Sequence, residues 1–214
     1  MLLEHSSGIR DRPLFYIRHY TIFGGGGDSD YELSRYVRDY LERNGRTYRN
    51  RNFGRWTPGA GFEYSNIAIA TLATVAERAS GEAFSSFTAR EIFSPLGMTR
   101  TTWFLGEVPE SERGNVAAPY FAGGFRRPYG YPDFPAGQLR TTVGDLSAFV
   151  GMWAAGGEWN GTRILGEKSV AAALPPPVEG IGHVWARYEM PFGSFVGHYG
   201  GEPGVATAAL FDPD

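Results

Sequence analysis

The sequence contains no cysteine and a single lysine, Lys168, among its 214 residues. Without cysteine, the chain has no disulfides, no thiolate zinc site and no cysteine nucleophile, and its redox compartment is left undecided. Long hydrophobic runs are missing too, because none approaches the roughly 18 apolar residues of a membrane span. The first three residues lead into Glu4 and His5 rather than into the apolar region of a signal peptide. We therefore expect no membrane segment in this chain, and its localisation is unknown.

A strong charge of either sign is absent as well. Lys and Arg number 20 against 23 Asp and Glu, which gives a formal net charge of −3, and the basic residues do not form a stripe. We therefore expect no nucleic-acid partner. The four histidines (His5, His19, His183 and His198) lack the His-x-x-x-His or His-Glu-x-x-His spacing of a helical metal pair. No metal ion and no cofactor are predicted.

What the chain does contain is enough apolar material for a folded domain. Hydrophobic residues make up 42% and aromatic residues 15%, while 30 Gly and 14 Pro predict many turns. Apolar residues at helical spacing predict helices over residues 28–45, 67–79, 83–93, 142–155 and 167–174. Extended segments over residues 183–190, 192–200 and 204–212, separated by turns, predict an antiparallel meander.

These elements predict an α+β fold. A helical lobe, about residues 1–175, would pack on an antiparallel sheet whose strands occupy about residues 180–214, in a single domain over residues 1–214. Within the lobe, residues 99–140 are expected to be irregular chain with short strands. Its aromatic residues could line a pocket or pack in a core. They are Trp103, Phe104, Tyr120, Phe121, Phe125, Tyr129 and Tyr131.

Three of the expected helices begin with candidate caps. Residues 28–30 (Asp-Ser-Asp) precede the first helix, and Ser65 or Asn66 can cap the helix over residues 67–79. Thr142 and Asp145 have the spacing of a capping box. These signals predict where the chain enters each helix.

Tyr64, Ser65 and Asn66 place a phenol, a hydroxyl and a carboxamide at the start of a buried helix. Because a helix N-terminus carries partial positive charge, such a triplet suits an anionic transition state. In the alternative interpretation, Ser65 or Asn66 only caps the helix and Tyr64 packs. The residues alone leave both interpretations open.

Residues 198–201 (His-Tyr-Gly-Gly) also allow two interpretations. They could be a strand whose backbone N–H groups receive an oxyanion, or a simple bulge and turn. Two further patterns point to no known site. The four glycines of residues 24–27 are interpreted as a flexible loop, because no Gly-Lys-Ser/Thr follows them. No serine has the Gly-x-Ser-x-Gly flanks of an α/β-hydrolase.

Taken in order, five segments resemble one family. They are residues 2–9 (LLEHSSGI), 58–66 (PGAGFEYSN), 92–98 (IFSPLGM), 135–146 (PAGQLRTTVGDL) and 197–204 (GHYGGEPG). Together they are similar to the β-lactamase-related penicillin-recognising serine hydrolases. That group includes class C β-lactamases, D-Ala-D-Ala carboxypeptidases, D-amino-acid peptidases and family VIII esterases. The resemblance spans nearly the whole chain and implies a β-lactamase/transpeptidase-like fold.

The resemblance also implies roles for five residues. Tyr64 would relay the proton of the nucleophile and protonate the leaving group, and His198 would assist Tyr64 or steer the substrate in place of the family's lysine. Asn66 would hydrogen-bond the substrate. Gly200 would let the substrate approach the strand edge, and the N–H of Gly201 would form half of the oxyanion hole. Histidine at position 198 favours the peptidase or esterase branches over the β-lactamases.

The family's Ser-x-x-Lys motif does not occur, because the residue three positions before Lys168 is Leu165. In relatives the motif lies upstream of the segment that here begins at residue 2, and a further strand and helix follow the last strand. We therefore expect an incomplete domain, a fragment of a larger hydrolase that lacks the nucleophile and is inactive alone. Ser6, Ser7 and Ser65 remain to be inspected, although none has a lysine or histidine base at local helical spacing.

The hypothesis from sequence is a serine hydrolase that performs acyl transfer on an amide, ester or β-lactam through a serine and a tyrosine relay. Its partner would be a small-molecule or peptide substrate. The alternative is a non-catalytic descendant of the family that binds peptides or muropeptides. Relatives are often periplasmic or secreted, but the sequence does not give the localisation, the substrate or the oligomeric state of this chain.

Overall fold

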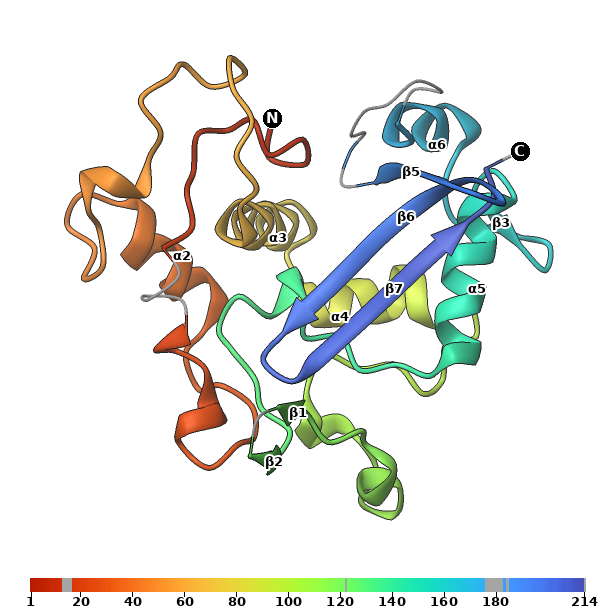
Figure 1. Ribbon diagram of the computed structural model, residues 1–214, viewed down its shortest axis with the longest axis horizontal. Coiled ribbons are helices and arrows are strands. Elements are labelled where there is room, and N and C mark those ends of the chain that lie inside the picture. Colours follow the sequence, from red (N-terminus) through yellow and green to blue (C-terminus); the bar gives the residue numbers. More distant parts are fainter. Residues whose placement is uncertain (13–16, 122, 176–182, 184, 214) are drawn as a thin grey trace. The chain divides into compact units, whose positions relative to one another are not determined.

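The computed structural model describes residues 1–12, 17–121, 123–175, 183 and 185–213 (Figure 1). Contacts group the chain into two units. The first comprises residues 1–85 and 102–140, and the second comprises residues 86–101 and 141–214. This grouping differs from the predicted lobes over residues 1–175 and 180–214, and the single domain stays a prediction. Each unit is described by itself.

Two helices form the centre of the first unit. Helix α2 (Leu33–Leu41) packs against helix α3 (Asn66–Ser80), whose apolar residues cover most of its first turns. Burial of these side chains supplies the main driving force for the packing. The buried residues of this core are Ile9, Tyr36, Tyr40, Ile67 and Ala68. Helix α3 confirms the predicted helix over residues 67–79, and it ends at Gly81, which adopts φ +76°.

Helix α2 is shorter at both ends than the predicted span of residues 28–45. Near its C-terminus the chain folds back so tightly that a Cβ on Gly45 would lie 2.4 Å from the carbonyl oxygen of Asp39. The backbone N–H of Thr47 then donates to that same oxygen at 3.0 Å. The helix therefore ends at Leu41 because the following residues pack against its last turn.

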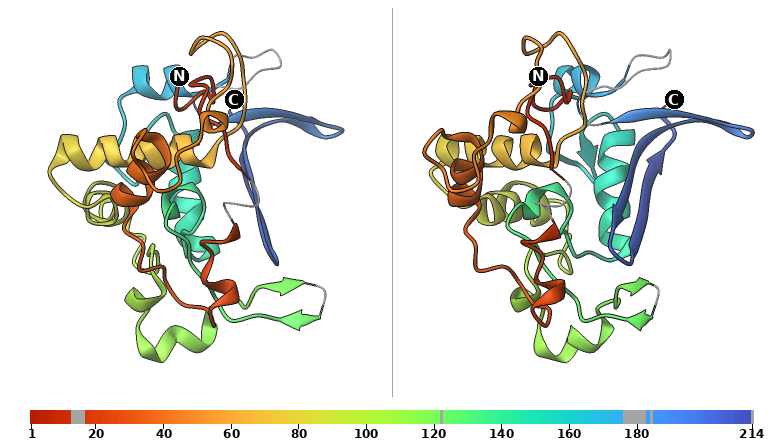
Figure 2. Two further views of the ribbon diagram at one scale, coloured as in Figure 1. Left: turned by 90° about the vertical axis from the view of Figure 1, so that its left-hand side faces the viewer. Right: turned by 60° about the vertical axis from the view of Figure 1, so that its left-hand side comes forward.

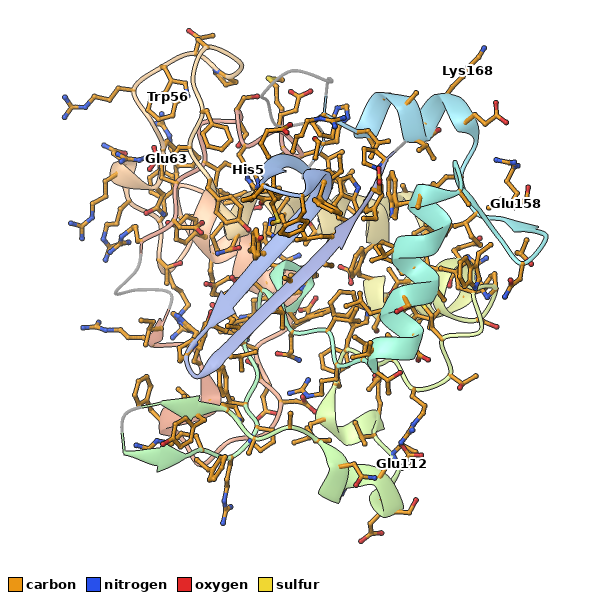
Figure 3. The ribbon with its side chains drawn as sticks, turned by 45° about the vertical axis from the view of Figure 1, so that its right-hand side comes forward. His5, Trp56, Glu63, Glu112, Glu158 and Lys168 are labelled. Atoms are coloured by element: carbon orange, nitrogen blue, oxygen red, sulfur yellow. The ribbon has the colours of Figure 1, made fainter. Side chains whose placement is uncertain are left out.

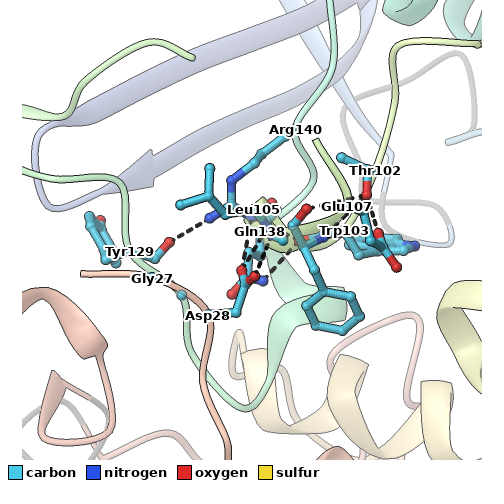
Figure 4. A network of polar contacts seen from close by, with 12 residues as sticks. Gly27, Asp28, Thr102, Trp103, Leu105, Glu107, Tyr129, Gln138 and Arg140 are labelled. Carbon is cyan, nitrogen blue, oxygen red and sulfur yellow. Dashed lines mark hydrogen bonds and ion pairs between the residues drawn. The ribbon is translucent and has the colours of Figure 1, made fainter. Parts of the chain in front are cut away.

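A half-buried arginine connects distant parts of the first unit (Figure 4). The guanidinium of Arg140 donates to the carbonyl oxygens of Trp103 and Tyr129, both at 2.8 Å. Its Nη1 lies 3.7 Å from Oδ1 of Asp28. Burial lowers the pKa of the Arg140 guanidinium, and the charge of Asp28 opposes that shift. Arg140 thus holds two loop carbonyls, and it shares that of Trp103 with the carboxamide of Gln138, whose Nε2 donates to it at 2.9 Å.

Asp28 belongs to the same network rather than to helix α2. Its two carboxylate oxygens accept the backbone N–H groups of Leu105 and Gly106, each at 2.8 Å. The prediction that Asp28 caps the first helix is therefore wrong, because the carboxylate is used by a loop that lies 77 residues further along the chain.

Residues 102–140 are irregular, as predicted. They contain a short hairpin of β1 (Tyr120–Phe121) and β2 (Gly124–Phe125) and three 3₁₀ turns, Leu105–Glu107, Glu110–Asn115 and Phe134–Ala136. Their described aromatic side chains comprise a buried group, an exposed group and Phe104, which is half-buried. Trp103, Tyr129 and Tyr131 are buried, whereas Tyr120 and Phe125 are exposed. Core packing therefore accounts for the first group, and the side chain of Phe121 lies outside the described residues.

The second unit combines helices with a sheet. Helix α4 (Phe84–Thr88), which begins at the end of the first unit, continues into a π-helical turn over Ala89–Phe93 and confirms the predicted helix over residues 83–93. Helix α5 (Val143–Ala154) follows, capped by the hydroxyl of Thr142, which accepts the N–H of Asp145 at 3.2 Å. The carboxylate of Asp145 accepts from Arg100 N and Thr101 Oγ1. A small hairpin, β3 (Glu158–Trp159) and β4 (Thr162–Arg163), leads to α6 (Glu167–Ala173).

The sheet of this unit has the order β5-β6-β7, with every neighbouring pair antiparallel. Its strands are β5 (Ala186–Met190), β6 (Gly193–Glu202) and β7 (Val205–Phe211), which confirms the predicted meander. Helix α5 runs along the sheet beside β7 (Figures 1 and 2). Trp185, Val196 and Phe211 form the core between them, together with side chains of α5. Helices with an antiparallel sheet establish the predicted α+β class.

None of the helices in the described part of the chain combines the length and the apolar character that crossing a membrane requires.

Replacing Arg140 by leucine should destabilise the first unit. The substitution removes the guanidinium donor from the Tyr129 carbonyl, leaves the Trp103 carbonyl with the Gln138 carboxamide as its donor, and leaves Asp28 without its nearest cation, a loss of about 2–4 kcal/mol. Urea unfolding followed by circular dichroism measures it. The matched control is Arg127→Leu, since Arg127 is exposed on the same loop. Equal unfolding midpoints for the two variants would contradict the role of Arg140.

Stability should also depend on Tyr31 at alkaline pH. Burial, followed by a 2.5 Å hydrogen bond to Asp39, raises the pKa of Tyr31 from 10.0 to about 12. Below pH 10.0 the folded and unfolded chains both hold this proton, and the stabilisation is complete. It is lost as the pH rises towards 12.

Tyr31→Phe should therefore make the decline of unfolding free energy between pH 9.5 and about 11.5 less steep. The difference between variant and parent isolates Tyr31, because burial also raises the pKa of Tyr36 and Tyr40. Tyr120→Phe, which removes an exposed phenol, serves as the control. An identical decline in Tyr31→Phe and the parent chain would show the prediction to be wrong.

Candidate active site

The start of α3 fixes the first group of predicted site residues. Ser65 is fully buried, and its hydroxyl caps the helix by accepting the N–H of Ala68 at 3.0 Å. That hydroxyl also donates to Oδ1 of Asp11 at 2.8 Å. Asp11 further accepts the N–H of Asn66 at 2.8 Å and that of Ile67 at 3.1 Å. One carboxylate thus satisfies two of the first backbone donors of α3 and the cap residue together.

This arrangement corrects one expectation about the helix terminus. The positive end of α3 was expected to suit an anionic transition state, but Asp11 already supplies an anion there. Ser65 acts as the cap, as the alternative interpretation stated. Its hydroxyl is buried and engaged in two hydrogen bonds, so it is not placed to act as a nucleophile.

Tyr64 and Asn66 differ from Ser65 in their exposure. The side chain of Tyr64 is 44% exposed although Ser65 beside it is fully buried. Asn66 is half-buried at the first position of α3, and its carboxamide forms no hydrogen bond to another described residue. The fold therefore holds the backbone of this triplet in place and presents a phenol and a carboxamide at the surface of the first unit.

His5 contacts three consecutive residues of this segment. Its carbonyl oxygen accepts the N–H of Glu63 at 2.9 Å, and its Nδ1 accepts the N–H of Ser65 at 3.2 Å. Its ring contacts that of Tyr64 in a tilted arrangement, with 4.2 Å between the centroids. The carboxylate of Glu63 is paired with Arg10 at 2.7 Å. Figure 3 marks His5 and Glu63 within the first unit.

The second group of predicted site residues lies on β6. The turn between β6 and β7 contains only Pro203 and Gly204, so Glu202 and Val205 exchange backbone hydrogen bonds. Backbone groups along an antiparallel strand point alternately to its two edges. Those of His198, Gly200 and Glu202 therefore face β7, and those of Tyr199 and Gly201 face the opposite edge.

Strand β5 occupies only part of that opposite edge. Its pairing with β6 ends at Ala186 and Gly197. Beyond this point, no described strand lies beside Tyr199 and Gly201. The N–H of Gly201 thus points from the edge of β6 at a place where a further chain or a ligand could accept its hydrogen bond.

The two glycines differ in what surrounds them. A Cβ on Gly200 would lie 2.4 Å from Oγ1 of Thr207, its partner on β7. A Cβ on Gly201 would have no atom within 4 Å among the described residues. Strand pairing thus contributes to the choice of glycine at position 200, whereas position 201 has open space on its side of the sheet.

His198 projects from the same face of β6 as Val196, because side chains alternate along a strand. Val196 is fully buried in the core formed with α5, and His198 is half-buried. Tyr199 lies on the other face, where its ring contacts Tyr188 at 4.9 Å. Burial, followed by the nearby Tyr199, raises the pKa of Tyr188.

Tyr64 and Asn66 belong to the first unit, and His198, Gly200 and Gly201 belong to the second. The structure orders each group internally. That the two groups act on one substrate stays a prediction.

Lys168 lies on α6, and its exposed side chain points away from the helix (Figure 3). In the part of the chain that the structure describes, no three His, Asp or Glu side chains gather closely enough to hold a metal ion. The glycine loop also uses its own amides, since Gly24 and Gly26 donate to the carbonyl of Thr21 and Gly27 donates to that of Pro128.

The family model for Beta-lactamase matches residues 1–214. The chain belongs to the β-lactamase family. This membership agrees with the resemblance of the five sequence segments. A search of the curated proteins finds no match to the chain.

Solved structures of related proteins support the β-lactamase-family fold. The octameric penicillin-binding protein homologue from Pyrococcus abyssi is 24% identical with a TM-score of 0.73, over 99% of this chain and 48% of that one. The D-amino acid amidase from Ochrobactrum anthropi SV3 is 21% identical with a TM-score of 0.64, over 96% and 57%. A class C beta-lactamase is 14% identical with a TM-score of 0.70, over 99% and 60%.

At these identities the likeness establishes the fold and not the substrate. This β-lactamase-family chain spans about half to three fifths of the length of these structures.

Sequence reasoning did not assign a role to Asp11 or His5. Asp11 stands between Arg10 and Arg12, which is typical of an exposed charged turn. His5 lies in a segment that resembles the family, but nothing local indicates its contact with Tyr64. Their partners are 54 and 60 residues away along the chain, so no short-range pattern could have identified them.

Asp11→Ala should loosen the start of α3. The variant removes a charge-assisted acceptor from Ser65, Asn66 and Ile67, which should cost about 1–3 kcal/mol. Hydrogen exchange of the Asn66 and Ile67 amides should accelerate at least tenfold. Asp30→Ala provides the matched control, because Asp30 is exposed. Unchanged exchange at both amides in Asp11→Ala would refute this role.

Proposed function

We propose that this β-lactamase-family chain serves acyl transfer on an amide, ester or β-lactam. In this proposal Tyr64 relays a proton, Asn66 hydrogen-bonds the acyl part of the substrate, and the N–H of Gly201 stabilises the oxyanion. His198 assists the Tyr64 network or steers the substrate. Gly200 keeps the strand beside Gly201 free of a side chain.

The observation that carries the proposal is the edge of β6 at Gly201, along which no described strand pairs. Its N–H points away from β7 and lies beyond the end of β5. Pairing of Gly200 with Thr207 and of Glu202 with Val205 fixes the strand on both sides of this donor. A fixed donor that does not reorganise during reaction is what stabilisation of a developing oxyanion requires.

Tyr64 supplies the group that such a reaction needs for proton transfer. An exposed phenol can accept a proton from an attacking hydroxyl only as phenolate, and neighbouring positive charge favours that form. The phenol can then return the proton to the leaving group. Because Asn66 follows two residues later at the start of helix α3, where Asp11 accepts its N–H, its backbone has a fixed position relative to that of Tyr64.

The proposal also includes the missing nucleophile. Lys168 is the single lysine, is exposed on α6 and follows no serine at the required spacing. Ser65 is buried and engaged by Asp11. We infer that the attacking serine is not among these 214 residues, so the chain alone forms no acyl-enzyme.

The choice of substrate class rests on the residue at position 198. Histidine in place of the family's lysine favours peptides, amides or esters over β-lactams. The D-amino acid amidase among the solved structures makes an N-acylated D-amino acid amide a suitable first ligand. A peptide strand could also pair with Tyr199 and Gly201 through its backbone.

A binding experiment tests the oxyanion donor. Amide chemical shifts of the chain are followed by NMR during titration with N-acetyl-D-phenylalanine amide, and Gly201 and Asn66 should shift together. Gly201→Pro removes the N–H and should weaken binding about 3- to 10-fold. Proline is tolerated here because the N–H faces the edge of β6 along which no described strand pairs. Gly201→Ala keeps the donor and places its Cβ in open space, so it is the matched control. Equal affinities for the two variants would overturn the assignment of Gly201.

A labelling experiment tests the absence of the nucleophile. The chain is incubated with a fluorescent penicillin and, separately, with a fluorophosphonate, and intact mass is measured. We expect no covalent adduct. A stoichiometric adduct on any serine would show that the inferred absence of the nucleophile is wrong.

A further inference from the structure

His5 is buried and held in an uncommon backbone conformation. Its side chain is only 3% exposed and its φ is +52°, in the left-handed region. Residues other than glycine adopt this conformation in only a few per cent of cases, histidine more often than most, and they keep it where the surrounding contacts determine it. His5 has such contacts, because its N–H donates to Leu2 O and its carbonyl accepts from Glu63 N.

The hydrogen bond of the His5 ring defines its protonation state. Nδ1 accepts the backbone N–H of Ser65 at 3.2 Å. A ring nitrogen can accept only through its lone pair, so Nδ1 is unprotonated and the proton of the neutral ring is on Nε2. Protonation of Nδ1 would place two donors opposite each other and break this bond.

The same ring contacts the side chain of Tyr64. The centroids of the two rings are 4.2 Å apart with a 36° interplanar angle, and Phe62 approaches the His5 ring edge-on at 6.0 Å. The phenol of Tyr64 is therefore oriented by an imidazole that is itself fixed to the residue following Tyr64. A change in the protonation state of the His5 ring must therefore alter both its hydrogen bond to Ser65 and its contact with the ring of Tyr64.

We propose that His5 is a positioning residue for Tyr64 and that its neutral ring is required for this role. A catalytic effect of His5 rests on the proposed function, in which Tyr64 is the proton relay. Neutral His5 holds the phenol in one orientation beside the start of α3. Protonation of His5 breaks its hydrogen bond to the Ser65 N–H and places a positive charge against the phenol ring, so that the environment of Tyr64 changes.

The charged groups around His5 have partners of their own. The carboxylate of Glu63 is paired with Arg10, and Asp11 accepts from Ser65 Oγ and from two amides of α3. Glu4 lies 3.2 Å from the amino terminus. The titration of His5 can therefore be separated from these groups by changing His5 alone, since imidazoles change charge in the neutral to mildly acidic range.

Two variants separate the acceptor from the ring. His5→Asn keeps an oxygen acceptor for Ser65 and tolerates a positive φ, but it removes the ring and its titration. His5→Phe keeps an aromatic ring against Tyr64 and removes the acceptor. A general loss of folding would affect both variants and also the amides of β6 in the second unit, which serve as the internal reference.

The experiment follows two signals by NMR between pH 4.5 and 8.5 in the parent chain and in both variants. They are the Ser65 amide and the ring carbon Cζ of Tyr64, which Tyr64→Phe assigns. In the parent chain both signals should titrate with one shared midpoint. His5→Asn should abolish this titration and keep the Ser65 amide protected from hydrogen exchange. His5→Phe should abolish the titration and accelerate that exchange at least tenfold, while the β6 amides stay unchanged.

Independent midpoints for the two signals, a titration that persists in His5→Asn, or unchanged Ser65 exchange in His5→Phe would each overturn the role of His5. None of these readouts needs a substrate. If the coupled titration is present but Gly201 and Asn66 do not respond to N-acetyl-D-phenylalanine amide, the positioning role holds and the proposed function fails. If Gly201 and Asn66 respond to the ligand but the coupled titration is absent, the proposed function holds and the positioning role of His5 fails.

Discussion

The carboxylate of Asp11 at the start of α3 determines how the first unit presents its candidate site. A helix begins with backbone N–H groups that have no partner within the helix, and burying them without acceptors is costly. Asp11 accepts two of these groups and the hydroxyl of Ser65. Because Ile67 and Ala68 are buried in the core immediately afterwards, the helix cannot shift without losing both its cap and its packing. The position of Tyr64 and Asn66 follows from this constraint.

The sheet of the second unit imposes a comparable constraint by its register. The two-residue turn at Pro203 and Gly204 fixes which backbone groups of β6 face β7. A shift of one residue would turn the Gly201 N–H towards β7 and Val196 out of the core. Burial of Val196 therefore also selects the direction of the Gly201 donor. The same packing that stabilises the unit thus determines which edge of β6 the Gly201 N–H faces.

The sequence was sufficient for the elements that depend on local patterns. Helix α3 follows from a strongly apolar segment over residues 67–79 that Gly81 closes, and the start of α5 follows from the hydroxyl of Thr142. The three strands follow from extended segments separated by turns. Asp28 shows where such reasoning stops, because a carboxylate with the position of a cap instead binds a loop 77 residues away. Polar contacts between distant segments depend on the assembled core. The partners of Asp28, Asp11 and His5 could therefore not be predicted from the residues next to them in the sequence.

The two groups of candidate site residues share one physical design. Tyr64 stands between Glu63 and Ser65, whose backbone N–H groups are both bound by His5. Gly201 stands between Gly200 and Glu202, which are both paired with β7. In each case the chemical group is exposed while the backbone on both sides of it is held by hydrogen bonds. The free energy of ordering these groups is thus supplied by folding, and a ligand that binds them meets donors and acceptors already in place. A site of this kind depends on its neighbours as much as on its reactive residues, since releasing His5 or the β7 pairing would leave Tyr64 or Gly201 present but no longer fixed.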